Sequence, residues 1–212
     1  MRIYDWHAAP NPRRLHIFLA EKGISVPLED VSDGTQLKQD YTNKFSQAMV
    51  PILELDDGTV IGEAMAICRY FEELHPNPPL FGTDPISKAK VQMWETRANE
   101  EGILAFGEFF RNTDPNFVDR GLPGSAEPIP QIPALIDRAK GRIRRFYKKL
   151  DGQLADNAFV AGDSYSVADI TALCALEFGA WSGMGVADEI ANECPNVKRW
   201  HAVVSARPST RA

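Results

Sequence analysis

The chain has 212 residues, of which 44% are hydrophobic and 25% are charged, and its formal net charge is −6 at pH 7. This length allows one or two globular domains with a sizeable core, while the acidic balance and the lack of a long basic stretch exclude nucleic acid as the expected partner. No apolar run approaches the ~20 residues of a transmembrane helix, and the first residues lack the apolar stretch of a signal peptide, so we expect a cytoplasmic protein with no membrane partner.

An α/β unit is predicted at the start of the chain. Its first strand, helix and second strand fall at residues 2–4, 12–22 and 26–31. The helix is indicated by Leu15, Phe18 and Leu19, which recur at the i, i+3 and i+4 spacing of one helix face. Gly23 then suits a left-handed cap after the last turn. A strand–helix–strand crossover implies that the two strands pair in parallel.

A hairpin and a helix are predicted to complete this unit. Asp57-Gly58 is the strongest short turn signal in the chain, and it predicts antiparallel strands at residues 51–55 and 59–61. A helix is expected over residues 63–75, and the polar stretch 36–44 predicts a short helix or a loop. Together these elements predict a mixed four-stranded sheet.

Only helices are predicted after a proline-rich linker that runs from Pro76 to Gly82. They are expected at residues 85–110, at 133–154, from 166 onward and from 195 to just before 208, with a loop at 121–133. Ser166 is the expected N-cap of the third helix, and Asp169 is expected to reach back to it as a capping-box acid. The change of pattern predicts an α/β domain at residues 1–82 and an all-α helical domain at residues 83–212.

Several local motifs resemble those of the cytosolic glutathione transferase superfamily, and the resemblance covers nearly the whole chain. Val50-Pro51 resembles the family's cis-proline loop, and Gly62-Glu63-Ala64 resembles its γ-glutamyl-binding segment. Gly162-Asp163, with Ser166 and Asp169, resembles the folding motif of its C-terminal domain. The resemblance implies a thioredoxin-like N-terminal domain, a helical C-terminal domain, glutathione as co-substrate and a homodimer.

The resemblance also implies a set of glutathione-binding residues. They are Val50 and Pro51 for the cysteinyl backbone, Glu63 and Ala64 for the γ-glutamyl end, and Gln36 and Lys38 for the glycyl carboxylate. Ala64 lacks the hydroxyl that the family usually has there, and one lost hydrogen bond to a charged group costs about 1.5–3 kcal/mol. The alternatives to ligand binding are that Glu63 is an acid favoured by the dipole in the first turn of its helix, and that Gln36 and Lys38 lie on an exposed polar helix.

The reactive turn departs from the usual family pattern. Ala8 and Ala9 stand where other classes carry serine or cysteine, and Ala9-Pro10-Asn11 most resembles the Thr-Pro-Asn turn of bacterial Nu-class members. This resemblance implies that Asn11 is the catalytic residue, stabilising the glutathione thiolate by donating a hydrogen bond without removing the thiol proton. The alternative is that Asn11 is only the N-cap of the next helix, beside Pro12.

The second substrate is expected to bind between this turn and the first long helix. The candidate lining residues are Ala8, Ala9, Trp94, Phe106 and Phe110. Together with the resemblance to glutathione transferases, they imply a small hydrophobic electrophile or a disulfide as the partner. The alternative is that the aromatic residues, which recur at helical spacing, belong to the core.

No metal site is predicted from the sequence. His16, His75 and His201 are too dispersed to suggest one, and the three cysteines form no C-x-x-C pair. Tyr4 and His7 are weaker catalytic candidates, for which a sheet face and an ordinary surface position are the alternatives.

Three functions stay open at this point. The leading one is a glutathione transferase that activates the thiolate for attack on an electrophile or a disulfide, with glutathione-dependent disulfide reduction as a further activity. The second is a non-catalytic binding or interaction protein of the same fold, which Ala8, Ala9 and Ala64 favour. The third is a specialised glutathione lyase or dehalogenase, whose site the loop 121–133 would shape.

Overall fold

The N-terminal region is built on one four-stranded sheet. The computed structural model describes residues 1–212 except 47, 126, 182–189 and 191. The strands are β1 (Arg2–Asp5), β2 (Leu28–Asp30), β3 (Ile52–Glu54) and β4 (Val60–Ile61), in the order β2-β1-β3-β4. β1 pairs with β2 in parallel, and the other two pairings are antiparallel, which confirms the predicted mixed sheet.

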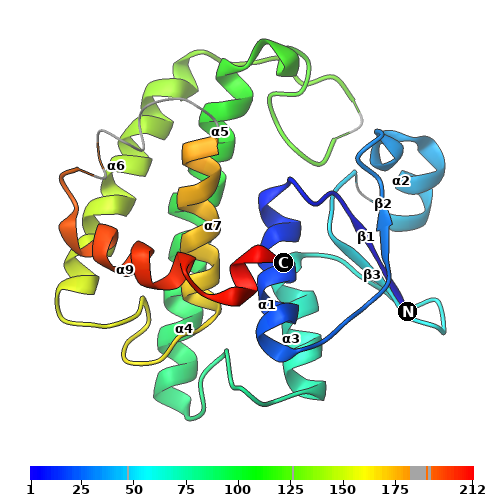
Figure 1. Ribbon diagram of the computed structural model, residues 1–212. Helices are drawn as coiled ribbons and strands as arrows, with labels where there is room; N and C mark the ends of the chain where they lie inside the picture. Colours follow the sequence, from blue (N-terminus) through cyan, green and yellow to red (C-terminus); the bar gives the residue numbers. More distant parts are fainter. Residues whose placement is uncertain (47, 126, 182–189, 191) are drawn as a thin grey trace.

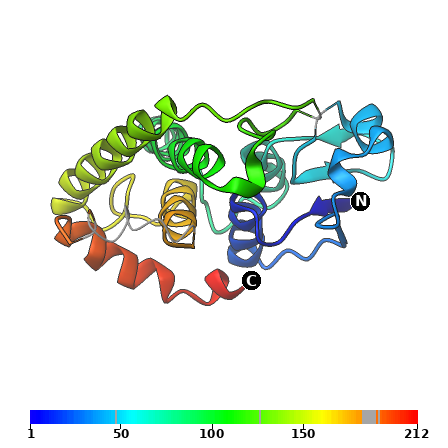
Figure 2. The same cartoon turned by 90° about the horizontal axis from the view of Figure 1, so that it is seen from above.

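Three helices pack around this sheet, and they are α1 (Pro10–Lys22), α2 (Gln39–Phe45) and α3 (Ala64–Leu74), with a 3-10 turn at Thr35–Leu37. Figures 1 and 2 show α1 and α3 between the sheet and the helical region, with α2 on the opposite side. Side chains alternate along the strands accordingly. Ile3 and Leu53 join the main core, whereas Tyr4 and Ile52 pack into a smaller cluster with Tyr41 of α2.

The rest of the described chain is helical, as predicted. The helices are α4 (Pro85–Arg97), α5 (Leu104–Thr113), α6 (Ala134–Ala155), α7 (Val167–Trp181) and α9 (Pro195–Ser205), with 3-10 turns at Pro115–Phe117 and Pro208–Arg211. Among the described residues, none of the helices has both the length and the apolar content that a bilayer-spanning segment requires.

The first long helix differs from its prediction. A single helix was expected over residues 85–110, but a π-helical segment, Ala98–Ile103, separates α4 from α5. Gly102 lies in that segment, and a Cβ built on it would be 2.9 Å from the Cβ of Ala175 and 3.1 Å from Cε1 of Phe146. The segment therefore brings its backbone against α7 and α6 at a point where only glycine fits without adjustment.

Helix α1 begins two residues earlier than predicted. Its N-cap is Ala9, which makes no side-chain capping bond, and Pro10 takes the first helical position. The alternative that Asn11 is the N-cap is therefore wrong, because Asn11 already lies inside the first turn. At the other end Gly23 has φ 65° and caps the helix in the left-handed conformation, as predicted.

Charged side chains on α1 connect the sheet region to the helical region. Arg13 pairs with Glu177 of α7 at 2.6 Å. The last turn of α1 holds a buried ion pair, in which Lys22 Nζ lies 2.6 Å from the Glu72 carboxylate of α3. Glu72 Oε1 also accepts from the backbone N–H of Leu80, at 3.0 Å, so the same carboxylate holds the start of the second region.

The expected reach of Asp169 back to Ser166 is confirmed, and it is part of a larger buried network. Asp169 Oδ2 accepts from the backbone N–H and the hydroxyl of Ser166, at 3.0 and 3.1 Å. Its Oδ1 accepts from Val160 N–H at 2.9 Å and from the indole of Trp200 at 2.8 Å. One carboxylate therefore joins α7, the preceding loop and α9.

Candidate functional site

The segment before β3 contains a cis peptide bond and is held in place by neighbouring elements. The Val50–Pro51 peptide bond is cis, as the resemblance implies. Just before it, Ala48 forms a β-bridge with Gly124 of the loop that follows α5, and the Tyr41 hydroxyl donates to the Met49 carbonyl at 2.9 Å. The edge beside Val50 is thus held by α2 on one side and approached by the 121–133 loop on the other.

Glu63 is held in an unusual conformation at the start of α3. It is the N-cap of that helix, with φ 63° and ψ 120°, and its side chain is exposed and makes no cap bond. A non-glycine residue at positive φ is strained, and such strain concentrates at ligand sites. Ala64 follows, buried, and the first N–H groups of a helix have no partner within it. The arrangement places a carboxylate beside N–H donors that have no partner within the helix.

Asn11 is oriented by a buried arginine. Its side-chain Oδ1 accepts from the Arg14 guanidinium at 2.8 Å. Because a guanidinium can only donate, this contact identifies the oxygen of the amide and directs the NH₂ group away from Arg14. Among the residues that the structure describes, the Asn11 NH₂ group has no acceptor, so its donors remain at the amino end of α1, where the helix dipole favours negative charge.

Arg14 itself is held by the helical region. It lies 3.3 Å from the Glu95 carboxylate of α4 and donates to Asn99 at 3.1 Å, and both Arg14 and Glu95 are buried. Burial raises the pKa of Glu95, an effect that the Arg14 charge opposes. The position of the Asn11 amide thus depends on residues of the second region, a dependence that the sequence analysis did not find. The adjacent arginines at 13 and 14 were its only local signal.

Gln36 and Lys38 are placed differently from each other. Gln36 is 5% exposed, and its buried Oε1 has no hydrogen-bond partner among the described residues. Lys38 is exposed, lies 3.6 Å from the Asp33 carboxylate and donates to the Thr35 hydroxyl at 3.1 Å. Of these two side chains, only that of Lys38 carries a positive charge, and a ligand can reach it from solvent.

The aromatic residues that were expected to line the pocket for the second substrate have two different environments. Trp94 and Phe106 are 4% and 2% exposed and belong to the main core, which is the alternative reading of their helical spacing. Phe106 is close enough to α7 that a Cβ on Gly179 would be 2.4 Å from its ring. Neither side chain is therefore free to line an open pocket.

Phe110, in contrast, belongs to a partly exposed aromatic cluster. The other members are Phe117, Phe178 and Trp181, with ring centroids 4.9–5.7 Å from that of Phe110. Trp181 is 66% exposed. The Arg13–Glu177 ion pair brings this end of α7 to the start of α1, and Figure 1 shows both at the same end of the molecule. The sequence analysis found only Phe110, because the other three lie on different elements.

Tyr4 is engaged away from the reactive turn. Its hydroxyl donates to Glu54 at 2.7 Å and accepts from Lys44 at 3.0 Å, and the ring packs in the α2-side cluster. Tyr4 therefore occupies a position on the face of the sheet, which was the alternative to a catalytic role.

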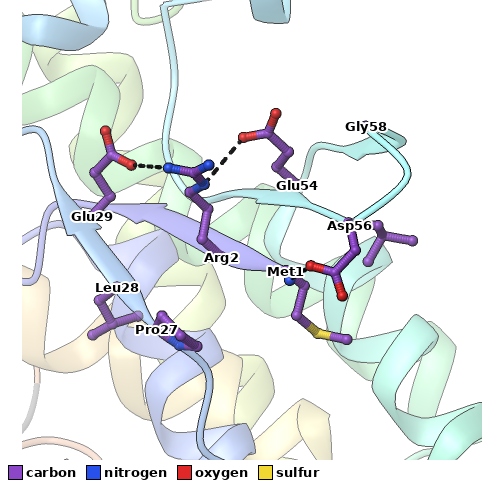
Figure 3. A pocket seen from close by; sticks show the side chains of 9 residues that line it. Met1, Arg2, Pro27, Leu28, Glu29, Glu54, Asp56 and Gly58 are labelled. Carbon is purple, nitrogen blue, oxygen red and sulfur yellow. Dashed lines mark hydrogen bonds and ion pairs between the residues drawn. The ribbon is translucent and has the colours of Figure 1, made fainter.

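An open pocket of about 530 Å³ lies elsewhere on the sheet (Figure 3). Arg2 crosses it, 3.1 Å from the Glu29 carboxylate and 3.4 Å from that of Glu54. Arg2 is at the start of β1, whereas the reactive turn follows the end of that strand, roughly 10 Å further along. With its charges already paired, this pocket is separate from the candidate site.

Comparisons with known proteins show the family of the chain. A model of the glutathione S-transferase N-terminal domain matches residues 8–74, and one of the C-terminal domain matches residues 116–208. Glutathione S-transferase 2 of Saccharomyces cerevisiae is 33% identical over 221 aligned positions, covering 100% of this chain and 88% of that protein.

Solved structures give the same result. The crystal structure of Gtt2 from Saccharomyces cerevisiae has a TM-score of 0.88 at 32% identity, covering 100% of this chain and 99% of the other. A glutathione S-transferase domain-containing protein from Marinobacter aquaeolei VT8 has a TM-score of 0.83 at 35% identity, covering 99% and 100%.

Proposed function

This chain belongs to the glutathione S-transferase family, and from that premise we propose that it binds glutathione in the groove beside Val50 and activates its thiol through Asn11. The observation that carries the proposal is the Arg14–Asn11 contact of 2.8 Å, which leaves the amide NH₂ of Asn11 as a donor at the amino end of α1. Glutathione is the co-substrate that this family uses.

The tripeptide would be held mainly by backbone groups. Its cysteinyl amide pairs with the backbone of Val50 beside the cis Pro51 bond. Its α-amino group binds the exposed Glu63 carboxylate, and its α-carboxylate binds the first N–H groups of α3, including that of Ala64. The buried Gln36 lies in the 3-10 turn Thr35–Leu37 and Lys38 follows it, just before α2, and we assign both to the glycyl carboxylate.

Asn11 would act by stabilising charge. A free thiol has a pKa of about 8.5, so lowering it by two units requires about 2.7 kcal/mol of preferential stabilisation of the thiolate. A hydrogen bond to a charged group contributes about 1.5–3 kcal/mol, and the N–H groups and dipole of α1 add to it. Because an amide is not a base, the thiol proton leaves to solvent.

Two substitutions at Asn11 test this role. Asn11→Ala removes the donor, and we expect the pKa of the bound glutathione thiol to rise and kcat/KM to fall about 10- to 100-fold. Asn11→Asp keeps the size and the Arg14 contact but replaces the NH₂ donor by a carboxylate oxygen, so it should lose at least as much activity. The measurements are thiolate absorbance of the complex against pH and a hydroxyethyl-disulfide assay. Unchanged thiol pKa and rate in both variants would remove Asn11 from the mechanism.

The second substrate would meet the thiolate between Ala8, Ala9 and the aromatic cluster around Phe110. The small side chains of the turn leave room there, and the exposed Trp181 ring offers an apolar surface. This supports a small hydrophobic electrophile or a disulfide, the latter in line with the Nu-class-like Pro-Asn turn. Trp94 and Phe106 have no part in it.

A binding protein with little catalysis is the second candidate. It is favoured by the absence of any side-chain hydroxyl or thiol at Ala8, Ala9 and Ala64. Calorimetry and the disulfide assay separate the two: glutathione binding without turnover of electrophiles or disulfides supports the binding protein, and turnover that depends on Asn11 supports the enzyme.

We assign the glutathione domain to residues 1–82 and the substrate domain to residues 83–212, and we propose a cytoplasmic homodimer. The domain division agrees with the last strand and α3 lying before residue 82 and only helices following it among the described residues. Analytical ultracentrifugation of the purified chain tests the dimer.

A further inference from the structure

Three side chains that are separate in the sequence meet at the end of β1. They are Asp5, His7 and His16, and one potential metal-ligating atom of each lies within 4.8 Å of the others. Asp5 is the last residue of β1, His7 lies in the turn closed by the Ala9 N–H to Trp6 C=O bond, and His16 is on the second turn of α1. The strand points Asp5 to the same face as Ile3, toward α1.

Two of the three side chains are buried, and each has one polar atom without a hydrogen-bond partner among the described residues. Asp5 is 4% exposed and His16 is 6% exposed. His16 Nε2 is 3.0 Å from Asp5 Oδ1, yet neither atom has a hydrogen-bond partner among the described residues, so this close contact is not a hydrogen bond. Each such buried atom costs about 1–3 kcal/mol if it stays unsatisfied. An ordinary hydrogen-bonded Asp–His pair does not have this geometry.

The geometry points to a site for a divalent transition-metal ion, bound by Asp5, His7 and His16. Metal–ligand bonds to imidazole and carboxylate are about 2.0–2.2 Å long, so two neighbouring ligand atoms lie roughly 3.0–3.5 Å apart. The Asp5–His16 distance of 3.0 Å already fits. His7 is exposed and its ring stacks on His16 with centroids 4.8 Å apart, so a side-chain rotation brings in the third ligand.

The donor set selects the class of ion. Two imidazoles and one carboxylate suit zinc, cobalt, nickel, copper or iron and not magnesium or calcium, which take oxygen ligands. Three protein ligands leave at least one coordination position, on the exposed His7 side, for water or another small ligand. A bound ion would join β1, the reactive turn and α1.

Titration of the tag-free, chelator-treated full chain with Zn²⁺ tests the site by calorimetry. We expect one ion per chain, and at least about 10-fold weaker binding by His7→Ala, since loss of a ligand should cost no less than loss of a supporting contact. His75→Ala is the matched control: this histidine is also exposed but lies at the end of α3, so its variant should bind like the wild type. Because His7 is exposed, its variant should fold, which circular dichroism verifies.

Cobalt absorption identifies the ligands independently of activity. Co²⁺ bound by nitrogen and oxygen shows visible bands without the strong near-ultraviolet band of a thiolate ligand, which distinguishes this site from the buried Cys68, Cys174 and Cys194. Absence of saturable binding, equal affinity of the wild type and His7→Ala, or a thiolate band would each overturn the proposal. Neither titration contains glutathione, so the outcome does not depend on the proposed transferase activity.

Discussion

Asp169 shows how much of the stability of this protein depends on one side chain. It is 0% exposed and accepts four hydrogen bonds from Val160, Ser166 and Trp200. Asp169→Asn replaces one acceptor oxygen by an NH₂ group that faces other donors. We expect the free energy of unfolding to fall by about 3 kcal/mol, because buried donors lose their acceptor. Urea denaturation measures the loss, and a loss below 1 kcal/mol would contradict the assigned network.

The same residue gives a pH dependence with a defined sign. Burial raises the pKa of Asp169 to about 6, in spite of the donors around it. Between about pH 4 and pH 6 the folded state therefore holds a proton that the unfolded chain has released, and this group's contribution to stability falls as pH rises through that window. The wild type should exceed Asp169→Asn by about 1 kcal/mol more at pH 5 than at pH 7. An equal difference at both pH values would disprove the raised pKa.

At this scale the sequence predicted contacts within one motif and missed contacts between motifs. The reach of Asp169 back to Ser166 follows from a spacing of three residues, so it was predictable. The Asn11–Arg14 contact could have been predicted in the same way, because the two residues are also three apart. The contact of Arg14 with Glu95 could not, because those residues are 81 positions apart in the sequence. The cluster of Asp5, His7 and His16 depends on the angle between β1 and α1, which no local pattern gives.

The π-helical segment between α4 and α5 provides a test at the scale of elements. Gly102→Ala would place a Cβ against Ala175 and Phe146, so we expect destabilisation of about 1–3 kcal/mol from overpacking. Gly107, in α5, has nothing within 4 Å of its Cβ position. Gly107→Ala should therefore stabilise the protein by about 0.5–1 kcal/mol, the ordinary helix preference for alanine. Thermal unfolding compares the two, and equal shifts would mean that α7 can move away from the segment.

The presence of most helices and strands was predictable because the local sequence signals agree with the tertiary structure. Asp57-Gly58 gave the β3–β4 hairpin, and Gly58 has the positive φ that such a turn needs. The π-helical segment was not predictable, because no local residue pattern marks a turn that holds one extra residue. The start of α1 was misplaced because Pro10 and Pro12 both suit a first turn, and the sequence does not choose between them.

The ion pair of Lys22 and Glu72 concerns the whole molecule, since it joins α1, α3 and the linker to the helical region. The Lys22 side chain is 0% exposed. Glu72→Gln leaves that ammonium without its counter-charge, and we expect a loss of about 3–5 kcal/mol. Glu73→Gln, at the exposed neighbouring position, should change stability by less than about 0.5 kcal/mol.

Two probes follow this unfolding, far-ultraviolet circular dichroism and tryptophan fluorescence. One core cluster contains residues of both regions, from Ile3 of β1 to Trp200 of α9, so we expect the two probes to give the same midpoint in the wild type and in Glu72→Gln. Separate midpoints in the wild type would show that the regions unfold independently.

The backbone at Glu63 has a consequence for how this chain can change over generations. A glycine there would relieve strain worth on the order of 1–3 kcal/mol, so selection for folding alone would favour losing the glutamate. The presence of glutamate at this position therefore has to be explained by something other than stability. Copies of the gene freed from that requirement should drift to glycine at this position first, which makes residue 63 a marker for whether a descendant still uses its groove.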